Sequence, residues 1–313
     1  MADKVATRDA YGKALVELGK RNPNVVVLDA DLSKSTKTAG FAKEFPGRFI
    51  QMGIAEADMA ATAAGLATCG KIPFFSSFAV FASGRCFEQI RNSIGYPHLN
   101  VKIAATHAGI TVGEDGGSHQ AIEDLALMRS IPGMTVIAPA DAADAEAAVY
   151  AAAEYEGPVY LRFGREPMPV IFPPDRKFII GKADRLREGR DVAIIANGVM
   201  TPIALQAAEQ LAAAGKQVRV INISTLKPID EAEITAAAKE TGAIVTAEEH
   251  TVIGGLGSAV AEVVVKHHPV PMECLGLQDR FGQSGSPAAL MREYGLTVED
   301  IVKAVEKVLA RKK

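Results

Sequence analysis

The sequence predicts two α/β domains, each built on a mainly parallel sheet with helices on both faces. Short β-branched runs alternate with longer, alanine-rich segments of helical pattern along the 313 residues. The expected strands are continuously apolar, which is typical of parallel strands that are buried on both sides. A proline-rich stretch near the middle separates two such series of elements.

The first series covers residues 1–170. Its expected strands are Val25–Leu28, Val101–Ala105, Thr135–Ala138 and Val159–Leu161. Its expected helices are Thr7–Lys20, Ala57–Cys69, Val80–Ile94, His119–Arg129 and Ala142–Tyr155. Strands that alternate with helices in this way predict a parallel sheet covered on both faces.

A connector is expected after this series, because Glu166–Pro174 contains four prolines. Prolines remove backbone donors and disfavour helix in the residue before them. We assign residues 171–187 to a linker and residues 188–313 to a second domain. Its expected strands are Asp191–Ala196, Val218–Ile221, Ala243–Ala247 and Pro271–Leu275. Its expected helices are Pro202–Ala214, Asp230–Glu240, Gly257–Lys266 and Thr297–Leu309.

The composition argues against several classes of partner. The 34 Lys and Arg residues nearly balance 37 Asp and Glu residues, so no broad basic field for nucleic acid or an anionic membrane is expected. The three cysteines are far apart and form no CxxC pair, which predicts neither a disulfide framework nor a metal site on this chain. A reducing, cytoplasmic location fits best. No apolar run approaches the roughly 20 residues of a membrane helix.

Glu56 stands near the start of the expected helix Ala57–Cys69. A carboxylate there gains from the helix dipole and can cap free backbone N–H groups, which is the interpretation that the local sequence favours. The alternative is a carboxyl held against a heterocyclic nitrogen. A buried acid has a raised pKa and can share a proton with such a base.

Phe75, Phe78 and Phe81 recur at every third residue, so one side of a strand-to-helix turn could present all three rings. Aromatic residues at this spacing more often belong to a core. Ser76 and Ser77 fit a plain core strand less well. The alternative is a site where a flat ring stacks on the phenyl faces.

The densest polar segment is Gly113–Gln120, which contains three glycines together with Asp115 and His119. One interpretation is a solvated loop in which Ser118 caps a helix that begins at His119. The other is a functional loop, because α/β proteins place their sites on loops that follow strands. His107 also follows an expected strand, although a lone histidine there is more often structural.

Two arginines are candidates for an anion site. Arg8 lies in the first turn of its helix, where a cation is electrostatically misplaced, and Arg165 follows the strand Val159–Leu161. Either one is by default a surface arginine. If they converge, they make a phosphate clamp through charge-assisted hydrogen bonds.

The segment Gly254–Ser258 lacks the spacing of a nucleotide loop, so its glycines indicate close packing of a helix on a sheet.

Taken in order, these segments resemble the transketolase family over nearly the whole sequence. The most specific run is Gly113–Gln120. The other matching segments are Ala6–Arg8, Asp29–Ser33, Gly53–Glu56, Phe75–Phe81, His107, Arg165, Glu248–His250 and Gly254–Ser258. The resemblance implies a pyrimidine-binding domain for thiamine diphosphate, followed by the family's C-terminal domain.

The resemblance also implies roles for individual residues. Glu56 is expected to hydrogen-bond N1′ of the cofactor's aminopyrimidine ring. The rings that hold this pyrimidine would be Phe75, Phe78 and Phe81, with Asp31 near the thiazolium. Asp115 and His119 would bind sugar hydroxyls during catalysis. The terminal phosphate of the sugar would be bound by Arg8, Ser35, His107 and Arg165.

One part of the family pattern is missing. The Gly-Asp-Gly…Asn stretch that binds the diphosphate and its Mg²⁺ or Ca²⁺ in the family has no counterpart in this sequence. The resemblance therefore implies a separate, diphosphate-binding N-terminal subunit, in an α2β2 assembly that transfers a two-carbon ketol unit between sugar phosphates.

The sequence leaves three alternatives open. Two are other thiamine enzymes, namely the beta subunit of a 2-oxo-acid dehydrogenase and a half resembling deoxyxylulose-phosphate synthase. The third is an α/β binding protein that kept the scaffold and lost catalysis. The combination of Glu56, Asp115, His119, Arg8 and Arg165 argues against the third.

Overall fold

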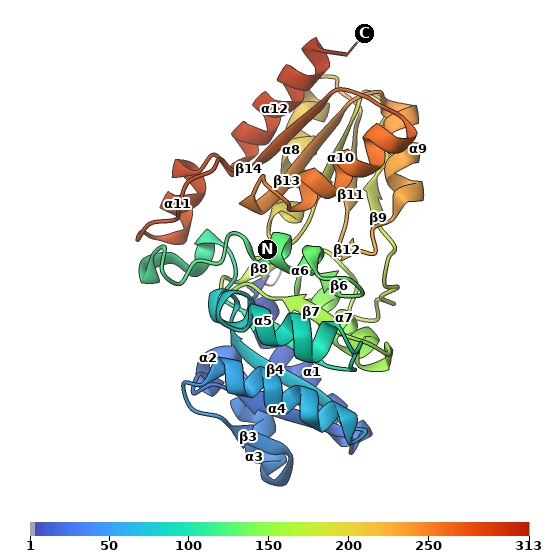
Figure 1. The fold of residues 1–313 in the computed structure, drawn as a ribbon. Coiled ribbons are helices and arrows are strands. Elements are labelled where there is room, and N and C mark those ends of the chain that lie inside the picture. Colours follow the sequence, from blue (N-terminus) through green and yellow to red (C-terminus); the bar gives the residue numbers. More distant parts are fainter. Residues whose placement is uncertain (1–3, 313) are drawn as a thin grey trace.

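A computed structural model describes residues 4–312 of the chain. Two sheets lie one above the other in Figure 1, the first in the lower half and the second in the upper half. Both are mainly parallel and are covered by helices, so the predicted fold class is confirmed. No described helix is long and apolar enough to cross a membrane.

The first sheet has seven strands in the order β12-β6-β7-β5-β4-β2-β3. They are β2 (Val25–Asp29), β3 (Phe49–Gln51), β4 (Ile72–Phe78), β5 (Lys102–Thr106), β6 (Thr135–Ile137), β7 (Val159–Arg162) and β12 (Thr225–Lys227). All neighbouring pairs are parallel except β12 with β6. The carboxyl ends of the parallel strands therefore meet at one edge of the sheet, where α/β proteins place their ligands.

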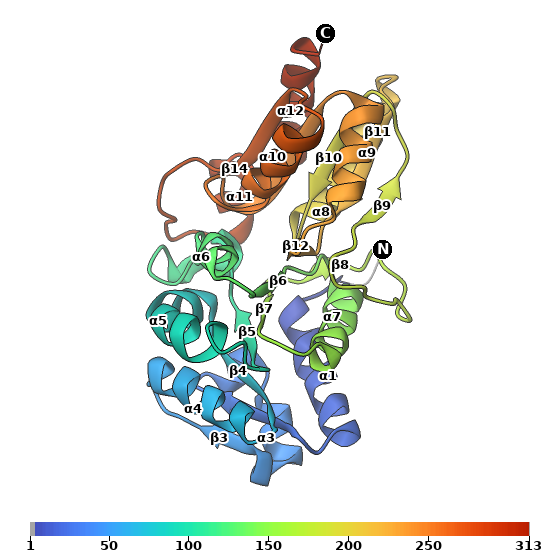
Figure 2. The same ribbon diagram turned by 45° about the vertical axis from the view of Figure 1, so that its right-hand side comes forward.

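Helices cover both faces of this sheet (Figure 2). On one face, α1 (Thr7–Arg21) and α7 (Ala142–Glu154) pack against residues such as Val27 and Phe74. On the other face lie α4 (Glu56–Thr68), α6 (Asp124–Ser130) and the helical segment 81–95 around α5 (Phe87–Gln89). Two short helices, α2 (Ser33–Thr36) and α3 (Ala39–Glu44), follow β2.

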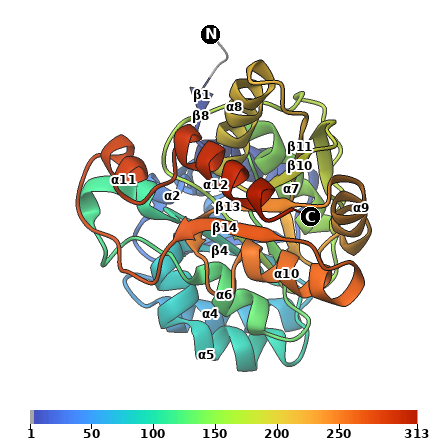
Figure 3. The same ribbon diagram turned by 90° about the horizontal axis from the view of Figure 1, so that it is seen from above.

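The second sheet has the order β14-β13-β10-β11-β9. Its strands are β9 (Asp184–Arg187), β10 (Val192–Ala196), β11 (Val218–Asn222), β13 (Ile244–Thr251) and β14 (Met272–Leu277). Its helices are α8 (Met200–Ala213), α9 (Glu231–Thr241), α10 (Leu256–His267), α11 (Pro287–Glu293) and α12 (Val298–Ala310). Seen from above, α12 and α10 lie on opposite sides of β13 and β14 (Figure 3).

The two halves share structure across the connector. β12 from the second half adds an antiparallel edge strand to the first sheet. Within the first half, β1 (Lys4–Val5) pairs with β8 (Met168–Pro169), just before the linker. Asp184–Arg187, which we placed in the linker, forms the edge strand β9 of the second sheet. One buried apolar cluster runs from the first sheet to α9 and α10 of the second half. The exact domain bounds stay a prediction.

Several sequence-based elements need correction. The expected helix His119–Arg129 begins only at Asp124, with Glu123 at its N-cap, so Ser118 does not cap it. The side chain of Gln120 donates to the carbonyl oxygens of Ile110, Gly113 and Gln283, which holds this part of the chain out of helical geometry. The strands β3 and β4 were not predicted as strands, and the expected helix Val80–Ile94 contains two π-helical segments.

Candidate active site

A cavity of about 500 Å³ lies at the carboxyl edge of the first sheet. His107 directly follows β5, and Arg165 lies three residues beyond β7. The cavity is lined by Arg8, Lys34, Ser35, Lys37, Phe78, His107, Asp115, His119 and Arg165. Most of the side chains singled out from separate parts of the sequence therefore meet in one place.

Arg8 and His107 are joined by a hydrogen bond that fixes the state of the imidazole. Nη1 of Arg8 donates to Nε2 of His107 at 2.8 Å and to the carbonyl oxygen of Ser35 at 3.2 Å. Because Nε2 accepts, the ring proton belongs on Nδ1, which lies 2.9 Å from Oγ1 of Thr106. Burial and the nearby guanidinium groups of Arg8 and Arg165 lower the pKa of His107 to about 3. The imidazole is therefore neutral at physiological pH.

The cavity carries an excess of positive charge. Arg8, Arg165, Lys34 and Lys37 line it against a single acid, Asp115. Lys37 forms an ion pair with Asp9 at 2.9 Å, and Arg165 lies 3.4 Å from Asp115. We did not predict the two lysines, although their positions on either side of Ser35 were a usable signal. Such a lining attracts an anionic group.

Ser35 is positioned by a buried carboxylate that we also did not predict. Asp29, at the end of β2, accepts hydrogen bonds from the N–H of Leu32 at 2.7 Å and from the hydroxyls of Thr36 and Thr38 at 2.6 and 2.8 Å. These contacts fold the segment after β2 into a tight turn. Asp31 is exposed on this turn and does not line the cavity, so its predicted place near a cofactor stays a prediction.

A row of aromatic rings leads away from the cavity. The ring of His107 stacks on Phe78 with centroids 3.8 Å apart, and Phe81 stacks on Phe78 at 6.0 Å with an interplanar angle of 11°. His119 presents its edge to both phenyl rings. Phe75, in contrast, has no exposed surface and belongs to the same buried apolar cluster as Met59. Phe75 therefore does not line this row.

Glu56 lies at the far end of this row. It is the first residue of α4 and is only 3% exposed, yet no side chain caps this helix. Its two carboxylate oxygens accept hydrogen bonds from Nη1 of Arg85 at 2.9 and 3.0 Å. The guanidinium of Arg85 in turn lies 4.7 Å from the centre of the Phe81 ring. The capping interpretation of Glu56 is therefore wrong, and the carboxylate faces the aromatic row.

The loop that carries Asp115 and His119 is held by the second half of the chain. Oε1 of Glu249, in β13, accepts a hydrogen bond from the N–H of Thr111 at 2.6 Å. Gly109 has a φ of 80°, and a side chain there would meet the Glu249 carboxylate at 2.2 Å, so only glycine fits. Ser284 adds a hydrogen bond to the carbonyl oxygen of Glu114. The loop conformation thus depends on both halves.

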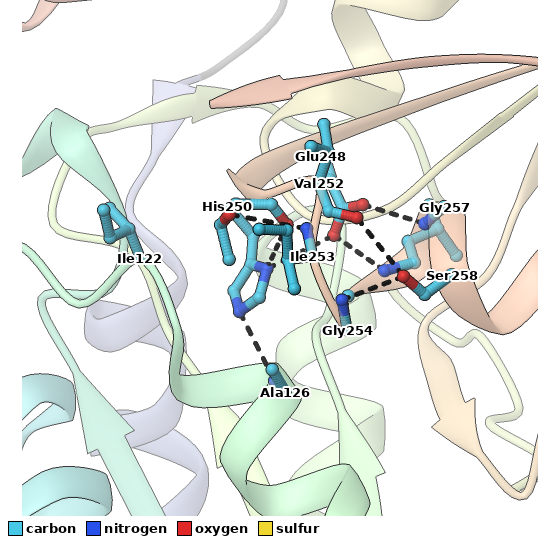
Figure 4. Close-up of polar contacts among 12 residues, drawn as sticks. Ile122, Ala126, Glu248, His250, Val252, Ile253, Gly254, Gly257 and Ser258 are labelled. Carbon is cyan, nitrogen blue, oxygen red and sulfur yellow. Dashed lines mark hydrogen bonds and ion pairs between the residues drawn. The ribbon is translucent and has the colours of Figure 1, made fainter. Parts of the chain in front are cut away.

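The end of β13 also organises α10 (Figure 4). Glu248 accepts hydrogen bonds from the N–H groups of Leu256 and Gly257 at 2.7 and 2.8 Å, as expected for a carboxylate at a helix N-terminus. Burial lowers the pKa of His250 to about 4, so this histidine is neutral and its Nδ1–H donates to the carbonyl oxygen of Thr251. A side chain at Gly257 would lie 3.0 Å from Cys274, so the expected close packing of a helix on the sheet is found at this glycine.

Replacing Glu249 by glutamine is expected to flatten the pH dependence of stability between about pH 4.5 and 7. Burial raises the pKa of the Glu249 carboxyl from 4.5 to about 7. The folded chain therefore keeps a proton that the unfolded chain releases, and stability is lost as pH rises through this window, by up to about 3 kcal/mol. Glutamine still accepts from Thr111 but does not titrate.

Urea unfolding of the wild type and of Glu249→Gln at about pH 5 and about pH 7.5 measures this effect. We expect the wild type to lose more of its free energy of unfolding than the variant does between these two pH values. The same change in both proteins would show that Glu249 does not titrate in this range.

Comparison with known proteins identifies the family. Residues 3–170 match the family model of the transketolase pyrimidine binding domain, and residues 181–301 match that of the transketolase C-terminal domain. The chain belongs to the transketolase family. The resemblance inferred from the sequence is thereby confirmed, and dependence on thiamine diphosphate is a property of this family.

Individual relatives match the chain over nearly their whole length. A putative transketolase C-terminal section from Methanocaldococcus jannaschii is 51% identical, with 95% of this chain and 94% of that protein covered. The 6-deoxy-6-sulfo-D-fructose transketolase subunit SqwH of Clostridium sp. is 45% identical over 97% of this chain and 95% of its own length. A solved structure described as a split gene transketolase, inactive beta4 tetramer, is 60% identical with a TM-score of 0.93, covering 99% of this chain and 100% of that one.

Proposed function

We propose that this transketolase-family chain is the pyrimidine-binding subunit of a split transketolase. With a separate diphosphate-binding subunit, it transfers a two-carbon ketol unit from a ketose phosphate to an aldose phosphate. The observation that supports this most is the continuity of one site. A buried carboxylate, a row of aromatic rings and a cationic cavity follow one another over a short distance.

The side chains at the Glu56 end fit the aminopyrimidine ring of thiamine diphosphate. A flat heteroaromatic ring stacks well on phenyl faces such as those of Phe78 and Phe81. A ring nitrogen that accepts a proton is complemented by a carboxyl in a water-poor environment, which Glu56 provides. The thiazolium carbon of the bound cofactor supplies the carbanion chemistry of the reaction. Glu56 would hold and share the proton at the pyrimidine nitrogen.

The cavity fits a polar substrate with an anionic end. Arg8, Ser35, His107 and Arg165 would bind the terminal phosphate, the arginines through charge-assisted hydrogen bonds. A neutral His107 holds the Arg8 guanidinium through Nε2 without adding charge to the cavity. Asp115 and His119, on the loop held by Glu249, would bind hydroxyl groups of the donor and acceptor sugars. The two lysines, Lys34 and Lys37, strengthen the positive potential around them.

A partner subunit is part of this proposal. The sequence has no Gly-Asp-Gly…Asn stretch for the diphosphate and its Mg²⁺ or Ca²⁺, so that part of the site would come from another polypeptide. The similar split-gene chain in its solved structure is an inactive tetramer of beta chains. This supports a site that is completed only between different subunits, which we propose to be an α2β2 assembly. The 2-oxo-acid dehydrogenase and deoxyxylulose-phosphate synthase alternatives are not favoured by the relatives.

Replacing Arg165 by alanine in the assembled enzyme is expected to raise KM for xylulose 5-phosphate about tenfold to a hundredfold. A hydrogen bond to a charged group contributes about 1.5–3 kcal/mol, and each 1.4 kcal/mol is about tenfold in binding. The KM for unphosphorylated xylulose should change little, because the lost contact is to the phosphate. Steady-state kinetics with both donors measures the difference.

Arg190→Ala is a matched control, since Arg190 is exposed and remote from the cavity lining. It should leave both KM values unchanged. Equal losses with the two donors in Arg165→Ala would exclude a phosphate clamp at this position.

A further inference from the structure

Arg85 occupies the space beside Glu56 that the proposed function assigns to a ring. Its guanidinium lies over the Phe81 ring and donates to both oxygens of the Glu56 carboxylate. A pyrimidine in that position would make the same two kinds of contact, one stacking on a phenyl face and one hydrogen bond to the carboxyl. The guanidinium is also planar and rich in N–H donors, so it imitates such a ring.

We infer that Arg85 is a built-in placeholder for the cofactor's aminopyrimidine ring and is displaced when that ring binds. This inference rests on the proposed role of Glu56. It goes beyond that role because it assigns to this chain a self-contact that competes with the cofactor.

The two partners of Glu56 compete for the same groups. Both oxygens of the carboxylate accept hydrogen bonds from Nη1 of Arg85. The guanidinium also lies over the Phe81 ring, on which the pyrimidine would stack. The carboxyl can therefore assist the cofactor only after Arg85 has moved away.

Displacement of Arg85 is easy in this structure. Its side chain is 52% exposed, whereas that of Glu56 is 3% exposed, so the arginine can turn into water while the carboxylate stays in place. Among the described residues, Glu56 is the only hydrogen-bond partner of the Arg85 side chain. The arginine also follows Gly84 in the π-helical segment Phe81–Arg85.

The Glu56–Arg85 pair stabilises the chain when no cofactor is bound. A carboxylate that is buried and unpaired is strongly destabilising, because it loses its hydration without compensation. Arg85 supplies this compensation until the cofactor arrives. The expected consequence is weaker cofactor binding, because the cofactor must first break the Glu56–Arg85 pair. A half-exposed pair of this kind lowers the apparent affinity by about fivefold.

The test is a calorimetric titration of thiamine diphosphate, in the presence of Mg²⁺, into this chain assembled with its diphosphate-binding partner. Arg85→Met keeps the length of the side chain and its apolar packing on Phe81 but cannot pair with Glu56. We expect its Kd for the cofactor to be about fivefold lower than that of the wild type. Arg91→Met, at an exposed arginine of the following helical segment, should leave Kd unchanged.

A second variant keeps the test decisive if Arg85→Met assembles poorly with the partner subunit. Arg85→Gln keeps one amide donor for Glu56 without the charge, so it should also bind the cofactor more tightly, by a smaller factor. Equal or weaker binding in the assembled variants would overturn the inference. In that case cofactor binding by the wild-type complex would leave the proposed function standing. Absence of cofactor binding by the wild-type complex would overturn both.

Discussion

Replacing Glu56 by glutamine in the assembled enzyme is expected to lower turnover by about 10²–10⁴-fold, the usual contribution of a positioned acid or base. Glutamine has nearly the same shape and can still contact a ring nitrogen, but it cannot give or take a proton there. Arg85 loses its charged partner, and because it is half exposed it can be hydrated instead. The fold should therefore survive.

Turnover with a ketose phosphate donor, together with a thermal melt of each protein, measures both parts of this expectation. Glu88→Gln is the matched control, since Glu88 is an exposed acid on the neighbouring helix α5. Its turnover should match that of the wild type. Wild-type turnover in Glu56→Gln would exclude Glu56 as the activating acid.

Replacing Arg162 by methionine is expected to destabilise the chain by about 3–5 kcal/mol, because it leaves a buried carboxylate without its partner. Nε of Arg162 donates to Asp124 at 2.8 Å, and Nη2 donates to the carbonyl oxygen of Glu249 at 3.0 Å. Asp124 has no exposed surface and also accepts from Tyr160. Burial by itself would raise the pKa of Asp124, but the charge of Arg162 lowers it overall.

Chemical denaturation of the purified chain measures this loss. Arg185→Met removes an arginine whose ion pairs with Glu233 and Glu188 lie at the surface, so it should cost less than about 1 kcal/mol. Adding Asp124→Asn to Arg162→Met should recover part of the stability, because the buried charge is then removed as well. A loss in Arg162→Met as small as that in Arg185→Met would contradict a buried, structurally required pair.

The fold class can be predicted from the sequence because the parallel strands are continuous apolar runs that lie between long segments of helical pattern. β2, β5, β6 and β7 all lie within or next to their predicted ranges. β4 was missed because its two serines and its proline are unusual in a core strand, although Ser76 is buried and hydrogen-bonded to Tyr11. β12 could not be predicted from the sequence. It lies in the second half of the chain and becomes an edge strand only by pairing with β6, which no local pattern indicates.

The site was predicted in part for a similar reason. His107, Asp115, His119 and Arg165 were singled out because they follow expected strands, and in α/β proteins such residues converge at one edge of the sheet. Arg8 was singled out as a cation in the first turn of a helix. All five line one cavity. Three-residue spacing suggested that Phe75 shares a side with Phe78 and Phe81. In the strand β4, however, side chains alternate between faces, so Phe75 and Phe78 point to opposite sides.

Residues that act through tertiary contacts could not be found from the sequence. Nothing in the local sequence indicates the contacts of Arg85, or those of Glu249 within its matching segment, because an arginine in a helical segment and an acid in a strand have many possible partners. Their roles appear only when Glu56 and Thr111 are brought to them by the fold. A sequence motif around Glu56 therefore could not have predicted its contact with Arg85.

One comparison tests the central claim, that this chain carries only half of a transketolase site, most directly. The purified chain is assayed for ketol transfer from xylulose 5-phosphate to an aldose phosphate, with thiamine diphosphate and Mg²⁺, first alone and then with a diphosphate-binding partner subunit. We expect no transfer by the chain alone, transfer by the pair, and no reaction of the pair with pyruvate. Transfer by the chain alone, or a pair that uses pyruvate and not the ketose phosphate, would contradict it.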